Sequence, residues 1–531
     1  MNSLFVILIS GVLFFWGYCF YAKKIEDLWH INPKASTPAY AKFDSVDYIP
    51  AKNWLVLFGH HFSSIAGAGP IIGPVIACCL WGWLPALVWI ILGAVFLGGV
   101  HDFGALITSV REGGSSIADI SQNVISRRAK ILFSLFVWLA LILVIAVFAY
   151  LSADTFIKEP AIVIPSLGLI LVAVVVGILL YNFKTNIILT TLFGLTLLAG
   201  LVFLGNIFPV ALAKYALNIW IAILFVYSYF ASILPVNILL QPRDYLSSFL
   251  LFFGAAAGII GILITRPNLN TPFYNKWVVA EGPLWPILCI TIACGALSGF
   301  HSLISSGTTS KQLPNERYAK RIGYGAMLLE GIVAVLAVIA VSIGLKGNQS
   351  LATALKQLGP INIFGQGYAQ ITQPLLGKYS KFIAITILNA FILTTLDTAT
   401  RICRYITEEL FKIKNRFLST AIVVILSALI AFSGKWSKIW PAFGASNQLV
   451  AALALLVVSC WLLAKNKSIK FTFIPAVLIL VTTVTALFVQ IANYIKTKEV
   501  ALSVICGLLI ILAFFIIWEA GGIFKLKLFR R

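Results

Sequence analysis

The chain has 531 residues, of which 60% are hydrophobic and 11% are charged, and its mean hydropathy is +0.99. This composition excludes a soluble domain of useful size and predicts an all-helical protein that crosses a membrane many times. The formal net charge of +21 does not indicate a nucleic-acid partner, because Lys and Arg stand at the ends of apolar segments and in short loops.

About fifteen apolar segments are present, and most have the roughly 17–25 residues that a bilayer crossing needs. They lie near residues 4–21, 55–80, 84–108, 131–154, 161–181, 187–205, 215–236, 248–265, 285–306, 322–345, 381–400, 418–433, 440–463, 471–493 and 500–519. Lys and Arg are concentrated in the loops after odd-numbered segments and in the C-terminal tail. The positive-inside rule therefore predicts an N-terminus outside and a C-terminus in the cytoplasm.

The second segment contains the most unusual stretch, residues 58–74, with the sequence FGHHFSSIAGAGPIIGP. Its glycines and prolines weaken the helical hydrogen-bond ladder, so we expect non-helical backbone at 63–69, bordering a cavity. The alternative is a packing device in which small residues let helices approach closely. Polar groups are expensive at membrane depth, which favours a binding site. The substrate-binding candidates in this stretch are His60, His61, Ser63, Ser64, Gly67 and Gly69.

The segment at 215–236 is a second candidate for a broken helix. It carries Tyr227 and Ser228, further substrate-binding candidates, and ends at Pro235 and Asn237. The second interrupted segment is the fifth apolar segment after the first. This spacing predicts an inverted-repeat core of five helices plus five. The predicted divisions are an N-terminal helix and connection (1–53), two repeats (54–205 and 206–405), and four accessory helices with a basic tail (406–531).

Isolated ionisable residues within apolar segments are candidates for ion coupling. Asp102 enters an otherwise uncharged helix, and Glu330 stands among Leu and Ile, where a carboxylate is costly unless it is protonated or paired. Glu330 is thus a candidate proton carrier, with a structural hydrogen bond as the alternative. For Asp397, the favoured interpretation is an i, i+4 salt bridge with Arg401, although it is also a coupling candidate.

Hydroxyl groups are dense at 295–310, where His301, Ser305 and Ser306 are the coupling candidates. Neutral oxygen ligands suit a hard cation such as Na⁺, whereas helix capping and a solvated loop are the alternative for 308–310. Asn447 and Gln448 are the polar residues of a later patch, 440–449, and we expect them to brace the core. No cofactor is expected besides the coupling ion, for which H⁺ is favoured and Na⁺ is the alternative.

Several of these stretches resemble the carbon starvation protein A family of bacterial inner-membrane carriers. The resemblance lies in residues 46–50, 58–74, 295–309, 324–334, 396–405 and 440–452. It implies uptake of peptides or pyruvate and a likeness to the amino acid–polyamine–organocation superfamily, whose core has ten helices in an inverted repeat. One departure is His101, where the family pattern has Gln before the Asp.

Together these features predict a secondary active transporter that imports a small organic nutrient, either a peptide or pyruvate, by proton symport. No G-x-x-x-x-G-K-[ST] motif indicates primary transport, and no H-E-x-x-H or G-x-S-x-G motif indicates an enzyme. Its expected partners are the substrate and membrane lipid. The alternatives are sodium coupling on the same fold, or a membrane sensor or intramembrane enzyme.

Overall fold

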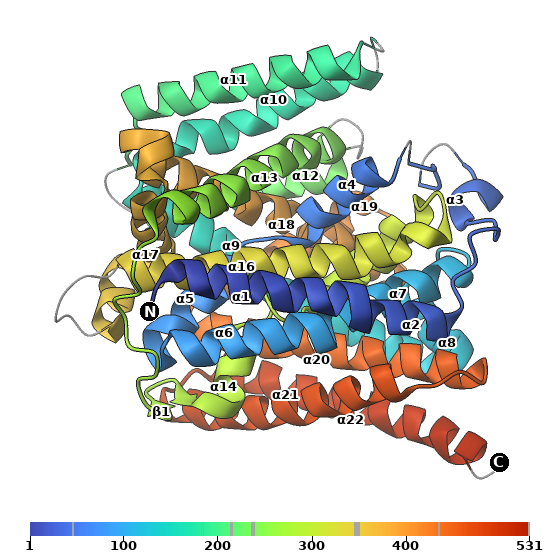
Figure 1. Ribbon diagram of the computed structural model, residues 1–531. Helices are drawn as coiled ribbons and strands as arrows, with labels where there is room; N and C mark the ends of the chain where they lie inside the picture. The colour runs from blue at the N-terminus through green and yellow to red at the C-terminus, as the bar shows by residue number, and fades with distance from the viewer. Residues whose placement is uncertain are drawn as a thin grey trace.

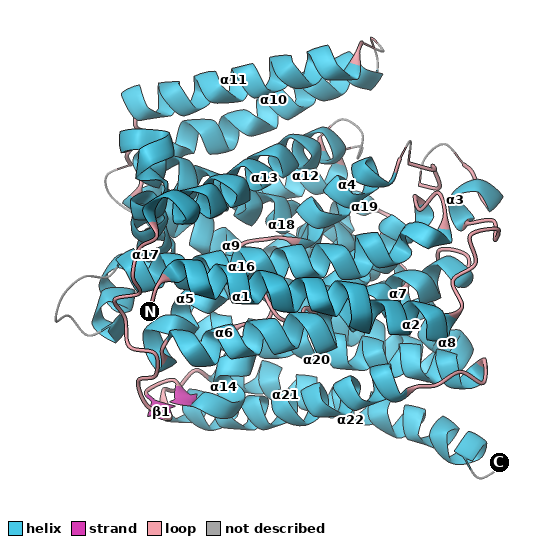
Figure 2. Ribbon diagram, viewed as in Figure 1, coloured by secondary structure: helices cyan, strands magenta, loops and turns pink. Residues whose placement is uncertain are grey.

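The computed structural model describes residues 1–44, 47–51, 53–181, 183, 185–212, 216–234, 239–344, 351–433 and 436–528 (Figure 1). Nearly all of these residues are helical, and the only strands among them form a hairpin of two residues each (Figure 2). Thirteen helices within this part of the chain are long and apolar enough to cross a membrane. The bent pair α4–α5 accounts for one more of the fifteen predicted segments, and two short helices, α14 and α15, stand where the remaining segment was predicted.

The thirteen spans share lengths of 18 residues or more. They are α1–α2 (Ser3–Trp16 and Ala22–Trp29), α6–α7 (Trp83–Leu92 and Gly99–Arg111), α9 (Arg127–Lys158), α10 (Val163–Tyr181), α11 (Ile187–Ile207), α12 (Ala216–Ile233), α13 (Leu240–Thr265), α16 (Gly325–Gly344), α18 (Ser380–Phe411), α19 (Arg416–Ser433), α20 (Trp436–Ala464), α21 (Lys470–Lys496) and α22 (Val500–Leu528).

The other elements join or extend these spans. They are the helices α3 (Pro38–Ala41), α8 (Ile117–Val124) and α17 (Leu351–Leu376), the strands β1 (Val278–Val279) and β2 (Gly282–Pro283), the π-turns η1 (Gly17–Tyr21), η2 (Gly93–Gly98) and η6 (Lys320–Tyr324), and the 3₁₀ turns η3 (Pro160–Ile162), η4 (Thr309–Lys311), η5 (Glu316–Tyr318) and η7 (Gly377–Tyr379).

The first broken helix confirms a break in the stretch 58–74. Helix α4 (Trp54–Ile65) and helix α5 (Gly69–Trp81) meet at an angle of 46°. Pro70 stands in the first turn of α5, where its missing N–H costs no helical hydrogen bond. The interruption is shorter than the predicted 63–69, because Ser63 and Ser64 still belong to the last turn of α4.

The second broken helix lies where the sequence predicts a continuous one. Helix α14 (Leu284–Thr291) and helix α15 (Gly299–Gly307) replace the single helix expected at 285–306. Conversely, α12 runs unbroken through Tyr227 and Ser228, so the predicted break is wrong over its described residues; Pro235 and Asn237 lie outside the described part of the chain. If each repeat begins with its broken pair, the second begins at Leu284, not at residue 206 as predicted.

The surroundings of the two broken pairs are alike. Each pair is followed by a span containing a π-turn, α6–η2–α7 after the first and η6–α16 after the second. Two 32-residue helices, α9 and α18, then pack against each other. Helix α13 packs on α4, as α20 packs on α15. This correspondence supports an inverted-repeat core that contains both broken helices, with the α10–α11 hairpin at its edge (Figure 1).

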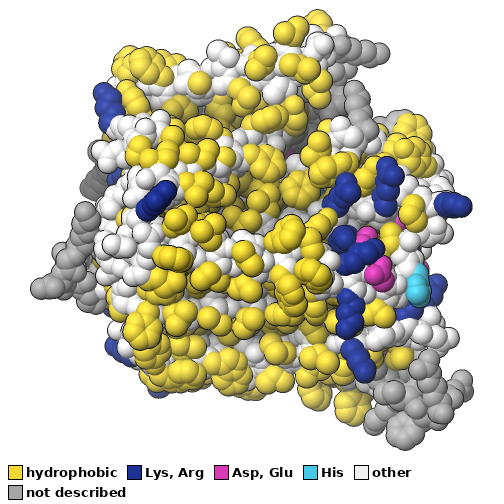
Figure 3. All heavy atoms as spheres, in the orientation of Figure 1, with side chains coloured by type: hydrophobic (Ala, Val, Ile, Leu, Met, Phe, Trp, Pro, Cys, Tyr) yellow, Lys and Arg dark blue, Asp and Glu magenta, His cyan; other side chains and the backbone are white. Residues whose placement is uncertain are grey.

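The surface of the bundle agrees with a membrane location. Figure 3 shows hydrophobic side chains over most of one face, with most of its visible Lys and Arg gathered at the edge beside the ends of α2 and α4. Helix α1 begins and helix α22 ends at opposite ends of the bundle (Figure 1). The protein is therefore a multi-pass membrane protein whose accessory helices α21 and α22 lie beside α20.

Candidate functional site

The two broken helices touch each other at their breaks, through glycines that admit no side chain. A Cβ atom on Gly69 would lie 2.4 Å from Cys294 Sγ, and one on Gly73 would lie 2.4 Å from the Thr291 carbonyl oxygen. The close-packing interpretation is thus correct for these two glycines. At the break itself, Gly67 faces helix α18, where a Cβ would lie 2.4 Å from Thr395 Oγ1.

Some surface remains accessible between the breaks. Gly67 and Cys294 are half-buried, whereas Ala66, Ala68 and Ala293 beside them are buried. The irregular backbone therefore lies within the protein, which is where a membrane tolerates it.

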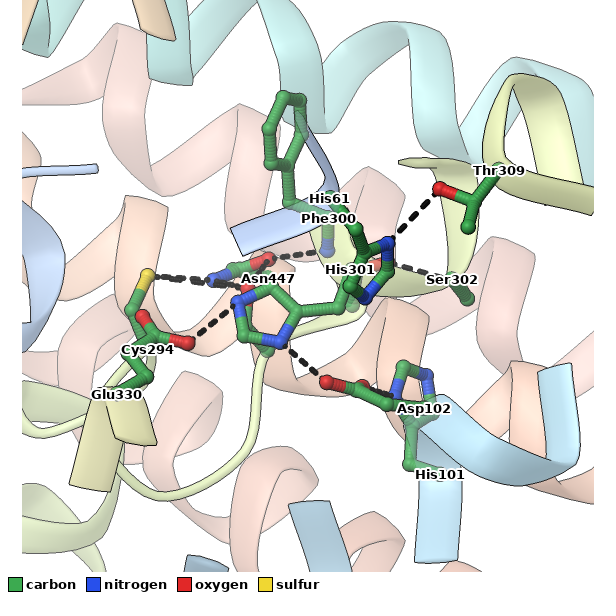
Figure 4. Close-up of polar contacts among 12 residues, drawn as sticks. His61, His101, Asp102, Cys294, Phe300, His301, Ser302, Thr309, Glu330 and Asn447 are labelled. Carbon is green, nitrogen blue, oxygen red and sulfur yellow. Dashed lines mark hydrogen bonds and ion pairs between the residues drawn. The ribbon is translucent and has the colours of Figure 1, made fainter. Parts of the chain in front are cut away.

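Helix α20 supplies hydrogen bonds to the break between α14 and α15. Asn447 Oδ1 accepts from the Phe300 backbone N–H at 3.0 Å, and Asn447 Nδ2 donates to Ser298 Oγ at 3.0 Å (Figure 4). Gln448 Nε2 donates to the Cys289 carbonyl at 2.7 Å. These bonds satisfy backbone groups that the interrupted helix leaves free, which confirms the predicted bracing role.

His301 in the first turn of α15 lies between two buried carboxylates from two other helices. Its Nδ1 is 2.8 Å from Asp102 Oδ2 on α7, and its Nε2 is 3.2 Å from Glu330 Oε2 on α16 (Figure 4). All three side chains are completely buried. Glu330 makes no hydrogen bond to the described residues beyond this ion-pair contact. The structure thus brings together three of the predicted ion-coupling residues.

Two more histidines extend this cluster. His101 Nδ1 lies 2.7 Å from the second oxygen of Asp102, and His61 Nδ1 lies 2.8 Å from Thr309 Oγ1 (Figure 4). His61 comes from α4 and Thr309 from the turn after α15, so this contact joins the first half of the first broken helix to the end of the second. His60 lies on another side of α4, within electrostatic range of Asp244 on α13.

The predicted serine candidates differ in whether their hydroxyl groups have hydrogen-bond partners. Ser63 and Ser64 donate to the His60 carbonyl at 3.0 and 2.8 Å, which closes the last turn of α4. Ser306 Oγ donates to the Ser302 carbonyl at 2.7 Å and accepts from the Ile117 N–H at the start of α8. Ser305 is buried and has no partner among the described residues.

Asp397 belongs to a second buried charge cluster, separate from His301. It pairs with Arg243 of α13 and accepts from the Tyr227 hydroxyl of α12. The predicted salt bridge to Arg401 is therefore wrong. Arg401 instead donates to the carbonyls of Ala231 and Leu234 at 2.6 and 2.5 Å, at the C-terminal end of α12. Carbonyls at the C-terminal end of a helix attract a cation.

Ser228, the remaining candidate, donates to the Phe225 carbonyl at 3.0 Å within α12. Arg243 was not predicted as a site residue, because the apolar segment was placed at 248–265 and left it in a loop. Helix α13 in fact begins at Leu240, so Arg243 is one turn inside it. An arginine in the first turn of an apolar helix, beside Asp244, was the available signal.

Comparison with known proteins identifies the family. The family model "Carbon starvation protein CstA" matches residues 2–351 and 344–486. The chain belongs to this family. It is 30% identical to the peptide transporter CstA of Bacillus subtilis, over 98% of this chain and 96% of that protein. It is 31% identical to the peptide transporter CstA of Escherichia coli and 30% identical to the pyruvate/proton symporter BtsT of the same species, in each case over 92% of this chain and 81% of the relative.

Solved structures support the fold of this CstA family member. A mutant of the Eremococcus coleocola manganese transporter superposes with a TM-score of 0.55 over 90% of this chain and 98% of that one. The sequence identity is 11%, so the likeness concerns the fold alone. The predicted resemblance to the carbon starvation family is confirmed, and the protein is a secondary transporter of the bacterial inner membrane, not an enzyme.

Proposed function

We propose that this protein imports a small carboxylate, either pyruvate or a short peptide, together with protons. The observation that carries the proposal is the contact of His301 with both Asp102 and Glu330, three buried ionisable groups from three helices. The names of the relatives, peptide transporter CstA and pyruvate/proton symporter BtsT, support the same substrates and the same ion.

The proposed role of Asp102, His301 and Glu330 is to carry the proton. Two ionised carboxylates and one imidazolium leave a net negative charge inside the bundle, and an unpaired charge is costly there. Adding one proton removes that net charge without moving a helix. Because Glu330 comes from α16 and His301 from the broken pair, a change in either helix position alters the contact that holds this proton.

The substrate is proposed to bind at the two breaks, between Gly67 and Cys294. Helix α5 begins just beyond the first break, and its positive dipole end favours an electronegative atom such as a carbonyl oxygen of the substrate. Pyruvate and peptides both have a carbonyl oxygen besides their carboxylate. His60, His61, Ser63, Ser64, Gly69, Tyr227 and Ser228 remain proposed substrate contacts, which form when the helices move.

The proposed orientation has the N-terminus outside and the C-terminus in the cytoplasm. It is supported by the Lys and Arg at the edge of the bundle beside the ends of α2 and α4 (Figure 3). His301 and Asp102 then lie in spans that end at the cytoplasmic side, so a proton held there reaches the cytoplasm by the shorter route.

Uptake by purified protein in liposomes tests the proposal. Labelled pyruvate and dialanine should enter faster as the external pH falls, without sodium, and a protonophore should abolish accumulation. Glu330→Gln keeps the size of the side chain and should flatten the pH profile, whereas the control Glu408→Gln, in a partly exposed i, i+4 pair with Arg404, should leave it unchanged.

Sodium coupling is the competing outcome of this experiment. Uptake that requires Na⁺ and ignores the pH gradient would contradict the proposed role of Glu330. It would assign ion binding to the 305–306 hydroxyls, of which Ser305 has no partner among the described residues. Binding of both probes without any transport would instead contradict the transport function.

A further inference from the structure

The buried cluster around Arg243 contains polar atoms that the fold leaves unused. Arg243 and Asp397 are 1% and 0% exposed, and they form an ion pair between α13 and α18. Arg243 Nε and Asp397 Oδ1 have no hydrogen-bond partner within the described part of the chain. Buried polar groups are nearly always satisfied, so an open donor and an open acceptor in one ion pair are positions where a further partner can bind.

The composition of the cluster suits recognition of a carboxylate. Arg243 Nη1 donates to the Tyr227 hydroxyl at 2.8 Å, and Nη2 lies 3.3 Å from Asp244 Oδ1. The Nε–H is therefore the guanidinium donor that has no acceptor among the described residues. A guanidinium binds a carboxylate through two parallel hydrogen bonds, which a lysine cannot reproduce.

The position of the cluster connects it with the proposed substrate site. Thr395, which faces the break at Gly67, and Asp397 lie within one turn of α18 but on different faces of it. Helix α13, which carries Arg243, packs against α4, and His60 of α4 lies within electrostatic range of Asp244. The cluster thus lies between α12, α13 and α18, and both α13 and α18 contact α4.

We propose that Arg243 receives the carboxylate of the substrate, and that Asp397 is its counter-ion when no substrate is bound. This inference rests on the proposed transport of carboxylates. It names Arg243 as the residue that selects them. The substrate carboxylate takes the place of Asp397 on the guanidinium, and the Tyr227 hydroxyl stays as a second donor. Because Arg243 is enclosed, the exchange takes place only after α4 moves away from α13.

Replacing Asp397, which competes with the substrate for Arg243, distinguishes this proposal from the alternative that the ion pair is purely structural. In Asp397→Asn the guanidinium loses its resting partner, so pyruvate and dialanine should bind about tenfold more tightly, as expected when an intramolecular competitor is lost. Saturating pyruvate should also raise the Tm of this variant more than that of the wild type, because the ligand now neutralises a buried unpaired charge. A structural pair would show neither gain.

The role of Arg243 in binding the carboxylate is tested with a variant in which both residues of the ion pair are neutral, so that the protein can still fold. The double variant Arg243→Gln/Asp397→Asn removes both charges together and avoids an unpaired one. It should lose pyruvate and dialanine affinity by about a hundredfold or more, the loss expected when a buried charge-assisted contact is removed. Binding of methyl pyruvate, which lacks the charge, should stay within about twofold. Lys381→Gln, which breaks the Lys381–Glu159 pair at the other end of α18, is the matched control and should bind both probes normally.

Two results would overturn the inference, and they differ from failure of the transport proposal. If the double variant binds pyruvate and dialanine as the wild type does, or if Asp397→Asn gains no affinity, Arg243 is not the receptor, although transport stands. If the wild-type protein neither binds nor imports either probe, the proposed function is wrong and this inference is wrong with it.

Discussion

The hydrogen bonds of Asn447 give the most direct measure of what holds the second break in place. In Asn447→Ala, the Phe300 N–H loses its acceptor and the Ser298 hydroxyl loses its amide partner, both inside the bundle. Each buried polar group left without a partner costs about 1–3 kcal/mol. The variant should therefore lose about 1–3 kcal/mol of unfolding free energy, because one of the two groups can find a new partner.

The assay is equilibrium unfolding of the purified protein in mixed micelles, compared with uptake in liposomes. Asn493→Ala is the matched control, because its amide makes one 3.3 Å bond to the Glu281 carbonyl near the surface. That control should stay within about 0.5 kcal/mol of the wild type. If Asn447→Ala also unfolds within that margin, α20 does not stabilise the break, and the bracing role is wrong.

Four further changes test other parts of the structure. Gly73→Ala should reduce stability and uptake, since the added Cβ would lie 2.4 Å from a backbone oxygen, whereas Gly507→Ala on α22 meets nothing within 4 Å and should be neutral by the same unfolding assay. Gly67→Leu should abolish uptake of pyruvate and dialanine with expression intact, because its side chain fills the space beside Thr395; uptake at the wild-type rate would contradict a site at the break. His61→Ala should shift the pH profile of uptake less than Glu330→Gln, because His61 contacts Thr309 and neither carboxylate. Cysteines introduced at residue 2 and residue 531 should label from opposite faces of the membrane, outside and inside respectively; labelling from one face would contradict the fifteen crossings.

Hydropathy predicted the thirteen helices that are long and apolar enough to cross a membrane, and the bent pair α4–α5, because length and apolar content decide whether a segment crosses a bilayer. It missed α17, which has Pro360, Asn362 and several glutamines and is kinked at Gly359, where φ is 75°. It also mistook α14–α15 for a continuous helix. The signal there was weak, because Gly295 and Gly299 are common in membrane helices, and the groups that stabilise the break come from Asn447 and Gln448, about 150 residues away.

The site was predicted residue by residue but not as an arrangement. A buried carboxylate in an apolar helix indicates a partner, and both Asp102 and Glu330 have one in His301. Sequence alone does not show which distant residue that partner is. For Asp397 the nearest candidate in sequence was Arg401, one helical turn away, whereas the fold brings Arg243 closer. Local spacing decides a pairing only when no other helix offers a better one.

The position of α4 explains how two separate charge clusters can act together. Adjacent residues on a helix point about 100° apart, so His61, which contacts Thr309, and His60, which lies within electrostatic range of Asp244, are on different sides of α4. Helix α4 has 12 residues and ends at the bend of 46°, so it can tilt as a unit about that bend. A tilt changes the surroundings of both histidines at once. Coupling between two sites requires one element whose position both sites affect, and α4 is the element that contacts both.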